Sequence, residues 1–191
     1  MYAERFLNKA QNFCEEVFKE TRFLREKQKK LVLFNNLYTD HIGYDCATHQ
    51  EYTDILEDLI SQEFITEKHT EVINSREITL VKLAKQVCND YTRGIFEYIE
   101  ICDQKPDNSQ ISGFDHVEWY YENNTHKHKK FISDDTYKYF SKQNNLEEFQ
   151  RPDYSKMLFK VKLEKAVHII SQEGLLWDIA LKSNPAGHTI L

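Results

Sequence analysis

The sequence contains little glycine and proline, with five Gly and three Pro in 191 residues. This scarcity argues against long flexible linkers or low-complexity tracts. The four cysteines are far apart and form no CxxC pair, so neither a disulfide framework nor a thiolate zinc site is indicated. The first ten residues carry no signal-peptide-like apolar stretch, and no window approaches the roughly 20 apolar residues that span a bilayer. We expect a cytoplasmic protein with reduced thiols.

The sequence also lacks a basic character, since its formal net charge is −6 and its pI is near 5.8. Nucleic acid is therefore not expected as a partner, because phosphate binding usually requires a basic domain or stripe. One short basic run, Arg25 to Lys30, is interpreted as a solvated helix face. What the chain does have is 40% hydrophobic residues and many aromatic ones, enough for the core of a single domain.

Hydrophobic periodicity predicts an α+β protein. Apolar residues three and four positions apart predict an amphipathic helix over 2–30, and a second helix over 48–60 has Thr48 as its N-cap. Residues 104–110 are the clearest linker. A further helix is expected over 134–144. Strands are predicted over 40–46, 64–72, 77–84, 95–102, 114–121, 157–163 and 166–170.

A short motif occurs twice: Asp40-His41-Ile42 and Asp115-His116-Val117 lie 75 residues apart. Each opens a strand that precedes a helix and further strands, which indicates an internal duplication. We therefore predict one domain, 1–191, built from two βαβββ modules that form a cupped mixed sheet. Its parts are a helical extension (1–36), the first module (37–104), the second module (111–173) and a tail (174–191). Within the tail, Gly174 to Leu181 is expected to form a short closing helix or to lie over the sheet, and residues 182–191 to be a poorly ordered or docking end.

Strand alternation separates the side chains into two faces. Ile42, Tyr44 and Cys46 are expected to pack against helices, as are Val117, Trp119 and Tyr121. The opposite, open face would carry Phe96 and Tyr98 together with imidazole and carboxylate groups. This mixture suits Zn, Fe, Mn or Ni better than Ca or Mg. The candidate metal ligands are His41, Glu100, His116 and His168, with Glu118 beside them as a ligand, a partner of His116 or a general base.

Three segments, Thr39 to Cys46, Arg76 to Leu83 and Gly113 to Glu118, with the strand around Tyr98-Ile-Glu100 between them, resemble YecM-like proteins. These belong to the vicinal oxygen chelate superfamily, which includes glyoxalases and extradiol dioxygenases. The resemblance covers roughly residues 36–171. It implies two βαβββ modules, with metal ligands on the first and last strands of each. Carried onto this sequence, those positions are His41 and Glu100, then His116 and His168, where the superfamily more often has Glu at the last position.

Other candidates are given structural roles. Cys46 and Cys102 are interpreted as small core residues, and the run His126 to Lys130 as solvated surface. No phosphate-binding loop or GxSxG motif is present. Two main hypotheses remain: a metal-dependent enzyme of the vicinal oxygen chelate type, and a non-catalytic module that binds a small ligand or a protein. A third is an interaction protein that acts through its N-terminal helix. We expect a small-molecule ligand and no membrane partner, and leave a homodimer open.

Overall fold

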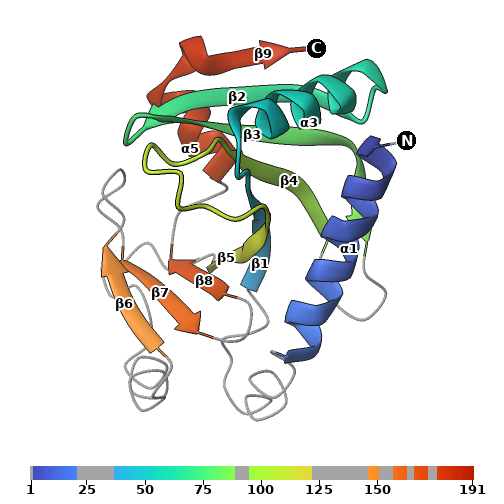
Figure 1. The fold of residues 1–191 in the computed structure, drawn as a ribbon. Helices are drawn as coiled ribbons and strands as arrows, with labels where there is room; N and C mark the ends of the chain where they lie inside the picture. Colours follow the sequence, from blue (N-terminus) through green and yellow to red (C-terminus); the bar gives the residue numbers. More distant parts are fainter. Residues whose placement is uncertain are drawn as a thin grey trace.

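The structure, a computed structural model, describes residues 2–20, 37–88, 95–121, 146–150, 157–162, 166–171 and 176–191. Its strands form one nine-stranded mixed sheet in the order β6-β7-β8-β5-β1-β4-β3-β2-β9 (Figure 1). The chain is therefore an α+β protein, as predicted. In chain order, the elements are α1 (Tyr2–Glu20), β1 (Leu37–Asp45), α3 (His49–Ser61), β2 (Ile65–Ile73), β3 (Arg76–Cys88), β4 (Ile95–Cys102), β5 (Gly113–Tyr121), β6 (Leu146–Gln150), β7 (Met157–Lys162), β8 (Ala166–Ser171), α5 (Leu176–Ser183), η2 (Pro185–Gly187) and β9 (His188–Ile190).

Local sequence signals explain the first half of the sheet. Thr48 caps α3 and its side chain accepts a hydrogen bond from the Glu51 backbone nitrogen at 3.1 Å, as the capping pattern predicts. Asn74 and Ser75 both have positive φ, the geometry of a tight two-residue hairpin between β2 and β3. The strands β2, β3 and β4 then form an antiparallel meander. The order β1, α3, β2, β3, β4 is the predicted βαβββ module.

The two halves of the sheet repeat the same strand order outward from the centre. At the centre, β1 pairs antiparallel with β5. Each of these strands has a parallel neighbour, β4 beside β1 and β8 beside β5. Beyond these lie β3 and β2 on one side and β7 and β6 on the other, and the whole sheet is cupped (Figure 1). This arrangement agrees with the predicted duplication, although the expected helix over 134–144 lies outside the described residues.

One face of the sheet is covered by α1 and α3. The ring of Phe114 on β5 packs against α1 and against Tyr44 of β1. Its centroid lies 5.2 Å from that of Phe6, 5.5 Å from that of Phe13 and 4.8 Å from that of Tyr44. Burial of large apolar side chains, each worth about 1.5–3 kcal/mol, holds α1 there. The core on this face also includes Ile42, Val117 and Trp119, as alternation predicted. Its other buried members include Ala10, Val17, Cys46, Ile55, Leu59, Ile99 and Ile101.

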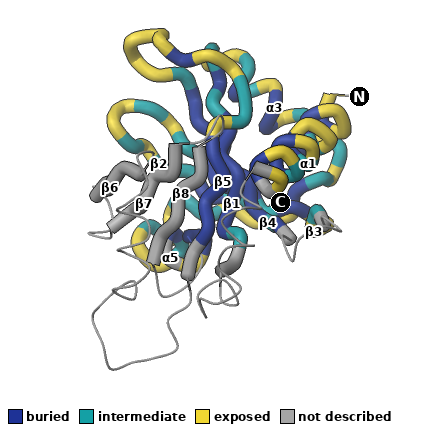
Figure 2. The backbone as a smooth tube through the Cα atoms, turned by 90° about the horizontal axis from the view of Figure 1, so that it is seen from below, coloured by how far each residue is buried: buried dark blue, intermediate teal, exposed yellow. Residues whose placement is uncertain are grey.

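The opposite face carries α5 and a smaller cluster. Trp177 of α5 stacks on Tyr98 of β4, with ring centroids 5.2 Å apart, and Leu80 and Leu176 complete the cluster. The last strand, β9, pairs antiparallel with β2 at the edge of the sheet. Figure 2 shows the central strands β1 and β5 as largely buried. The closing helix expected over 174–181 is thus present as α5, and residues 182–191, for which docking or poor order was left open, dock at the edge of the sheet.

Some expectations about the strands were wrong. Phe96 was assigned to the open face with Tyr98, yet it belongs to the helix-side core. The β3–β4 pairing shifts register between Lys82 and Val87, and this irregularity breaks the alternation on which the assignment rested. Strand β6 was missed within a polar stretch, and β9 was not predicted as a strand.

Several predictions concern residues outside the described ranges. They include the end of the first helix beyond residue 20, the basic run at 25–30 and the His126–Lys130 run. Within the described ranges, no helix is both long and apolar enough to cross a bilayer.

Candidate metal centre

The two Asp-His motifs lie on the neighbouring central strands, and each forms a β-bulge. In the β1–β5 ladder, Thr39 pairs with Trp119 and His41 with Glu118, so Asp40 is an extra residue on β1. Further along, Gly43 pairs with His116 and Tyr44 with Phe114, so Asp115 is an extra residue on β5. A bulge changes the direction of the side chains next to it. Both motifs therefore place an aspartate beside the histidine that follows it.

Each aspartate contacts the Nδ1 atom of its histidine. Asp40 Oδ1 lies 3.1 Å from His41 Nδ1, and Asp115 Oδ2 lies 3.2 Å from His116 Nδ1. Because a carboxylate accepts hydrogen bonds, the proton of each neutral imidazole is held on Nδ1 and the lone pair on Nε2. A carboxylate that fixes the tautomer in this way is a common partner of metal-binding histidines.

The two Nε2 atoms point at each other across the strand pair, 3.4 Å apart. Two nitrogens bound at about 2.05 Å to one tetrahedral zinc ion lie about 3.4 Å apart as well. Glu100 Oε2 of β4 lies 3.8 Å from His41 Nε2. One ligand atom from each of His41, Glu100 and His116 falls within 4.8 Å of the other two, and all three residues are buried. The donor set of two imidazoles and a carboxylate fits a divalent ion.

Gly43 makes room for the second histidine. It pairs with His116 on one side and with Glu100 on the other, in the middle of the site. A Cβ at Gly43 would lie 2.5 Å from His116 Nδ1 and 2.8 Å from its Nε2. Only glycine therefore lets the His116 ring lie over β1, close to His41.

Glu100 is oriented by a cysteine two positions along the same strand. The Cys102 thiol donates to Glu100 Oε1 at 3.5 Å, which leaves Oε2 on the side of His41. Burial, and then the charge of Glu100, raise the pKa of Cys102 well above its ordinary value. The thiol thus stays protonated and acts as a donor, which is more than the inert core role predicted from sequence.

Glu118 lies on the other side of His41. Its Oε2 is 3.9 Å from His41 Nε2, and its side chain is almost completely buried. Burial lowers the pKa of His41, but the charge of Glu118, the hydrogen bond that His41 donates to Asp40 and the charge of Glu100 outweigh this effect and raise the pKa to about 9. The same negative groups that hold a proton on this imidazole would attract a cation.

The fourth predicted ligand, His168, lies in β8 beside Glu118, which is its register partner in β5. Its side chain is outside the described part of the structure. Glu100 occupies the matching position in the first half, since it is the register partner of Gly43 in the parallel pair β1–β4. The backbone thus places His168 one strand away from Glu118, as expected for the mate of Glu100 in a duplicated site.

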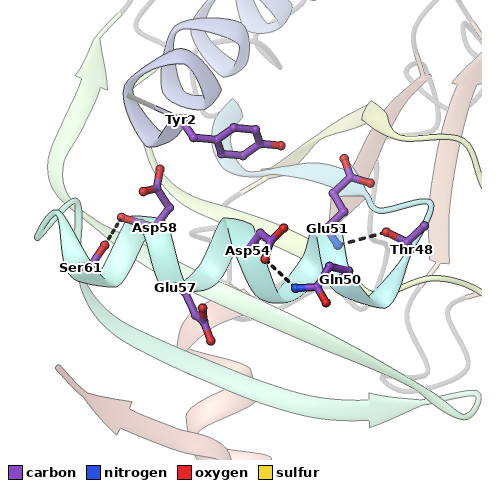
Figure 3. Close-up of a pocket in the computed structure, with 8 residues that line it drawn as sticks. All are labelled: Tyr2, Thr48, Gln50, Glu51, Asp54, Glu57, Asp58 and Ser61. Atoms are coloured by element: carbon purple, nitrogen blue, oxygen red, sulfur yellow. Dashed lines mark hydrogen bonds between the residues drawn. The ribbon is translucent and has the colours of Figure 1, made fainter.

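Two cavities among the described residues lie away from His41 and His116. The larger, about 810 Å³, is on the outer side of α3 below Tyr2 (Figure 3). Its charged lining is acidic, with Glu51, Asp54, Glu57 and Asp58. The other, about 620 Å³, lies between α3 and the β2–β9 edge. Neither contains one of the residue groups that could hold a metal ion in the described ranges.

Comparison with known proteins gives the family. A family described as YecM protein matches residues 4–175. The chain belongs to the YecM family. No curated protein matches its sequence. A solved structure described as "Structural Genomics, Protein EC4020" has a TM-score of 0.60 and 16% identity, and the similarity covers 91% of this chain and 92% of that one.

The YecM resemblance predicted from three short segments is thus confirmed over most of the chain. At 16% identity, the structural similarity shows a shared fold and no more. The residues that sequence analysis missed in this YecM protein are those that support the histidines: Asp40, Asp115, Gly43 and Cys102. The repeated Asp-His pair was a visible signal, but nothing in the sequence indicated that each aspartate would turn back onto its own histidine.

Proposed function

We propose that the protein is a divalent-metal-dependent enzyme of the vicinal oxygen chelate type that acts on a small, oxygen-rich substrate. The observation that carries this proposal is the convergence of three ligand atoms, His41 Nε2, His116 Nε2 and Glu100 Oε2. In each of these side chains the other polar atom, Nδ1 or Oε1, has a hydrogen-bond partner that orients the group. Preorganised ligands of this kind cost little to arrange when an ion binds. Zn, Fe, Mn and Ni all suit two imidazoles and a carboxylate.

The proposed ligands are His41, His116 and Glu100, with His168 as a fourth from the adjoining strand. When bound, such an ion acts as a Lewis acid toward two adjacent oxygens of a substrate. The residues around it bind and orient that substrate and exclude water. His116 and Glu100 retain some exposure, with 10% and 11% of their side chains accessible, so we place the approach of a ligand on their side.

Glu118 is the proposed proton carrier. Its carboxylate lies 3.9 Å from His41 Nε2, beside the proposed ion, and is almost fully buried. A buried carboxylate is suited to accept a proton from a carbon next to a polarised carbonyl, because no water competes for it. Whether the overall reaction is an isomerisation, a lyase reaction or an oxygenation depends on the substrate.

A test begins with the metal content of protein purified without an affinity tag. We expect about one divalent ion per chain, lost in His116→Ala and retained in His49→Ala. His49 is a suitable control because it is largely exposed and pairs with Asp103, 2.8 Å away, outside the proposed centre. A folded wild-type protein that takes up no Zn²⁺, Mn²⁺, Ni²⁺ or Fe²⁺ would contradict the proposal.

A second measurement tests the open coordination positions. Protein loaded with Co²⁺ is titrated with oxalate, a ligand with two adjacent oxygens, while the visible spectrum is recorded. We expect the spectrum to change, because a catalytic ion keeps positions for substrate.

The second candidate function is a non-catalytic binding module. It is favoured by the burial of His41 and Glu118, which resembles that of a structural centre. A bound metal with a spectrum insensitive to oxalate would support this alternative.

A further inference from the structure

The last sixteen residues cross the face of the sheet that carries the candidate metal centre. This C-terminal strap, residues 176–191, comprises α5, η2 and β9. It begins against β1 in the middle of the sheet and ends as an added strand beside β2 at the edge (Figure 1). The strap therefore joins the centre of the sheet to its rim on the side of the metal ligands.

Its first contact is with the aspartate that orients His41. The Leu176 backbone nitrogen donates to Asp40 Oδ2 at 2.9 Å, while Asp40 Oδ1 faces His41 Nδ1 at 3.1 Å. Asp40 and His41 are both fully buried. The two oxygens of one carboxylate thus serve two elements 136 residues apart, the first turn of α5 and the candidate ligand. A carboxylate at the N-terminus of a helix is also favoured by the helix dipole.

The next residue of the strap contacts the strand of the second ligand. Trp177 stacks on Tyr98 with an interplanar angle of 26°, and Tyr98 precedes Glu100 by two residues on the same face of β4. Leu80, the register partner of Glu100 in β3, belongs to the same cluster. Docking of α5 therefore packs one side of the candidate centre as well as holding Asp40.

The far end of the strap is anchored independently. The Trp177 ring meets His188 edge to face, at a centroid distance of 5.7 Å, and His188 Nε2 lies 3.3 Å from Glu67 Oε2. The Leu191 backbone nitrogen donates to the Thr66 carbonyl at 2.9 Å. The C-terminal strap is therefore held against the sheet by contacts at both of its ends.

We propose that Asp40 is a positioning residue through which docking of the strap and orientation of His41 depend on each other. The metal-binding part of this inference rests on the proposed function. An undocked α5 leaves Asp40 without its backbone donor, so that the carboxylate turns and the proton on His41 Nδ1 is no longer held. Because such coupling is reciprocal, a metal bound at His41 must in turn stabilise the docked strap.

The second Asp-His motif supplies a matched control. Asp115 contacts His116 as Asp40 contacts His41, but its side chain is half exposed. Asp40→Asn and Asp115→Asn make the same chemical change at equivalent positions of the two halves. An asparagine carries one acceptor oxygen in place of two, so at Asp40 that oxygen faces either His41 or Leu176 and the amide nitrogen, which is a donor, faces the other.

The experiment compares four proteins: the wild type, Asp40→Asn, Asp115→Asn and Trp177→Ala. In the metal-free proteins, hydrogen exchange is followed at the amides of α5, and the imidazole ¹⁵N signals of His41 and His116 by NMR. We expect amides 176–181 to exchange about tenfold faster in Asp40→Asn, since one buried hydrogen bond is lost, and at the wild-type rate in Asp115→Asn. We expect Trp177→Ala to change the ¹⁵N signals of His41 and to leave those of His116 unchanged.

Zn²⁺ affinity is then measured by calorimetry. We expect a loss of about 10–100-fold in Asp40→Asn, the usual effect of removing a residue that orients a metal ligand. A loss of several-fold is expected in Trp177→Ala, although Trp177 binds no metal. Trp177→Phe, which keeps an aromatic ring, is expected to restore both the His41 signals and the affinity. If the alanine variant is unfolded, Asp40→Asn and its matched control Asp115→Asn decide the question.

The inference is overturned if Trp177→Ala leaves the His41 signals at their wild-type positions while the α5 amides exchange faster, or if Asp40→Asn exchanges at the α5 amides like Asp115→Asn. It is equally overturned if Zn²⁺ binds without slowing exchange in α5. A wild-type protein that binds no Zn²⁺ contradicts the proposed function alone. In that case the His41 signals in the metal-free variants still decide whether Asp40 couples the strap to the imidazole.

Discussion

The two Asp-His motifs share a local geometry but differ in their surroundings. In both, a bulge places the aspartate carboxylate about 3 Å from Nδ1 of the next residue. Asp40 and His41 are fully buried, and Asp40 also accepts from α5. Asp115 is half exposed, and His116 retains slight exposure. The comparison teaches that the same backbone bulge occurs in both halves, whereas the surrounding fold buries one histidine completely and leaves the other near solvent.

The largest expected difference between the two halves is in stability. In the metal-free protein, His41→Ala removes a buried imidazole and leaves Glu100, Glu118 and Asp40 facing one another. We expect a loss of about 3–5 kcal/mol, typical of breaking a buried charged network. For His116→Ala we expect about 1 kcal/mol, since solvent can reach its neighbours. Urea unfolding in the presence of EDTA measures both, and equal losses would remove the distinction between the completely buried histidine and the slightly accessible one.

The same network makes the stability of the metal-free protein depend on pH. The pKa of His41 is about 9 in the folded state and 6.5 as a free group. A raised pKa means that the folded state binds the proton more tightly than the unfolded state does. The contribution of His41 to the free energy of unfolding is therefore complete below about pH 6.5 and is lost as the pH rises through about 9. We expect unfolding free energies to fall over this range in wild type and to fall much less in His41→Gln. Parallel pH profiles would show that His41 is not the group responsible.

A methyl group at the centre of the site is expected to separate metal binding from stability. Gly43→Ala would drive the His116 ring away from His41, because a Cβ has no room beside that ring. We expect Zn²⁺ affinity to fall at least tenfold, with a loss of stability of only about 1–3 kcal/mol from overpacking. Calorimetry and urea unfolding test the two parts. Unchanged affinity would mean that the observed place of the His116 ring is not the one that binds metal.

The smallest expected effect concerns the thiol beside Glu100. Cys102→Ala removes the donor to Glu100 Oε1 and frees the carboxylate to rotate. We expect a loss of stability of about 1 kcal/mol and a decrease of Zn²⁺ affinity of a few-fold. Cys102→Ser, which keeps a donor, is the matched control and is expected to bind more nearly like wild type. If alanine and serine behave alike, the thiol does not orient Glu100.

Much of the fold was predictable because periodicity follows burial. The alternation of Ile42 and Tyr44 against His41 gave the correct faces of β1, and the Thr48 capping pattern gave the start of α3. The prediction was wrong at Phe96, where a register shift outweighs alternation. Bulges depend on how two strands pair, and that information is not contained in either strand alone.

The candidate centre was predictable in part for the same reason. Strand faces brought His41, Glu100 and His116 together, and the structure places these three close to one another. The orienting role of Asp40 was not predictable, since simple alternation puts it on the opposite face from His41. Nor was the contact from Leu176, because it joins segments 136 residues apart in the sequence.

The most direct test of the account is X-ray absorption at the zinc edge of protein loaded with one equivalent of Zn²⁺. We predict a first shell of nitrogen and oxygen with outer-shell scattering from at least two imidazoles, and the loss of one imidazole in His116→Ala. A spectrum without imidazole scattering, or one that the His116 variant leaves unchanged, would contradict the claim that the two Asp-His motifs form one metal centre.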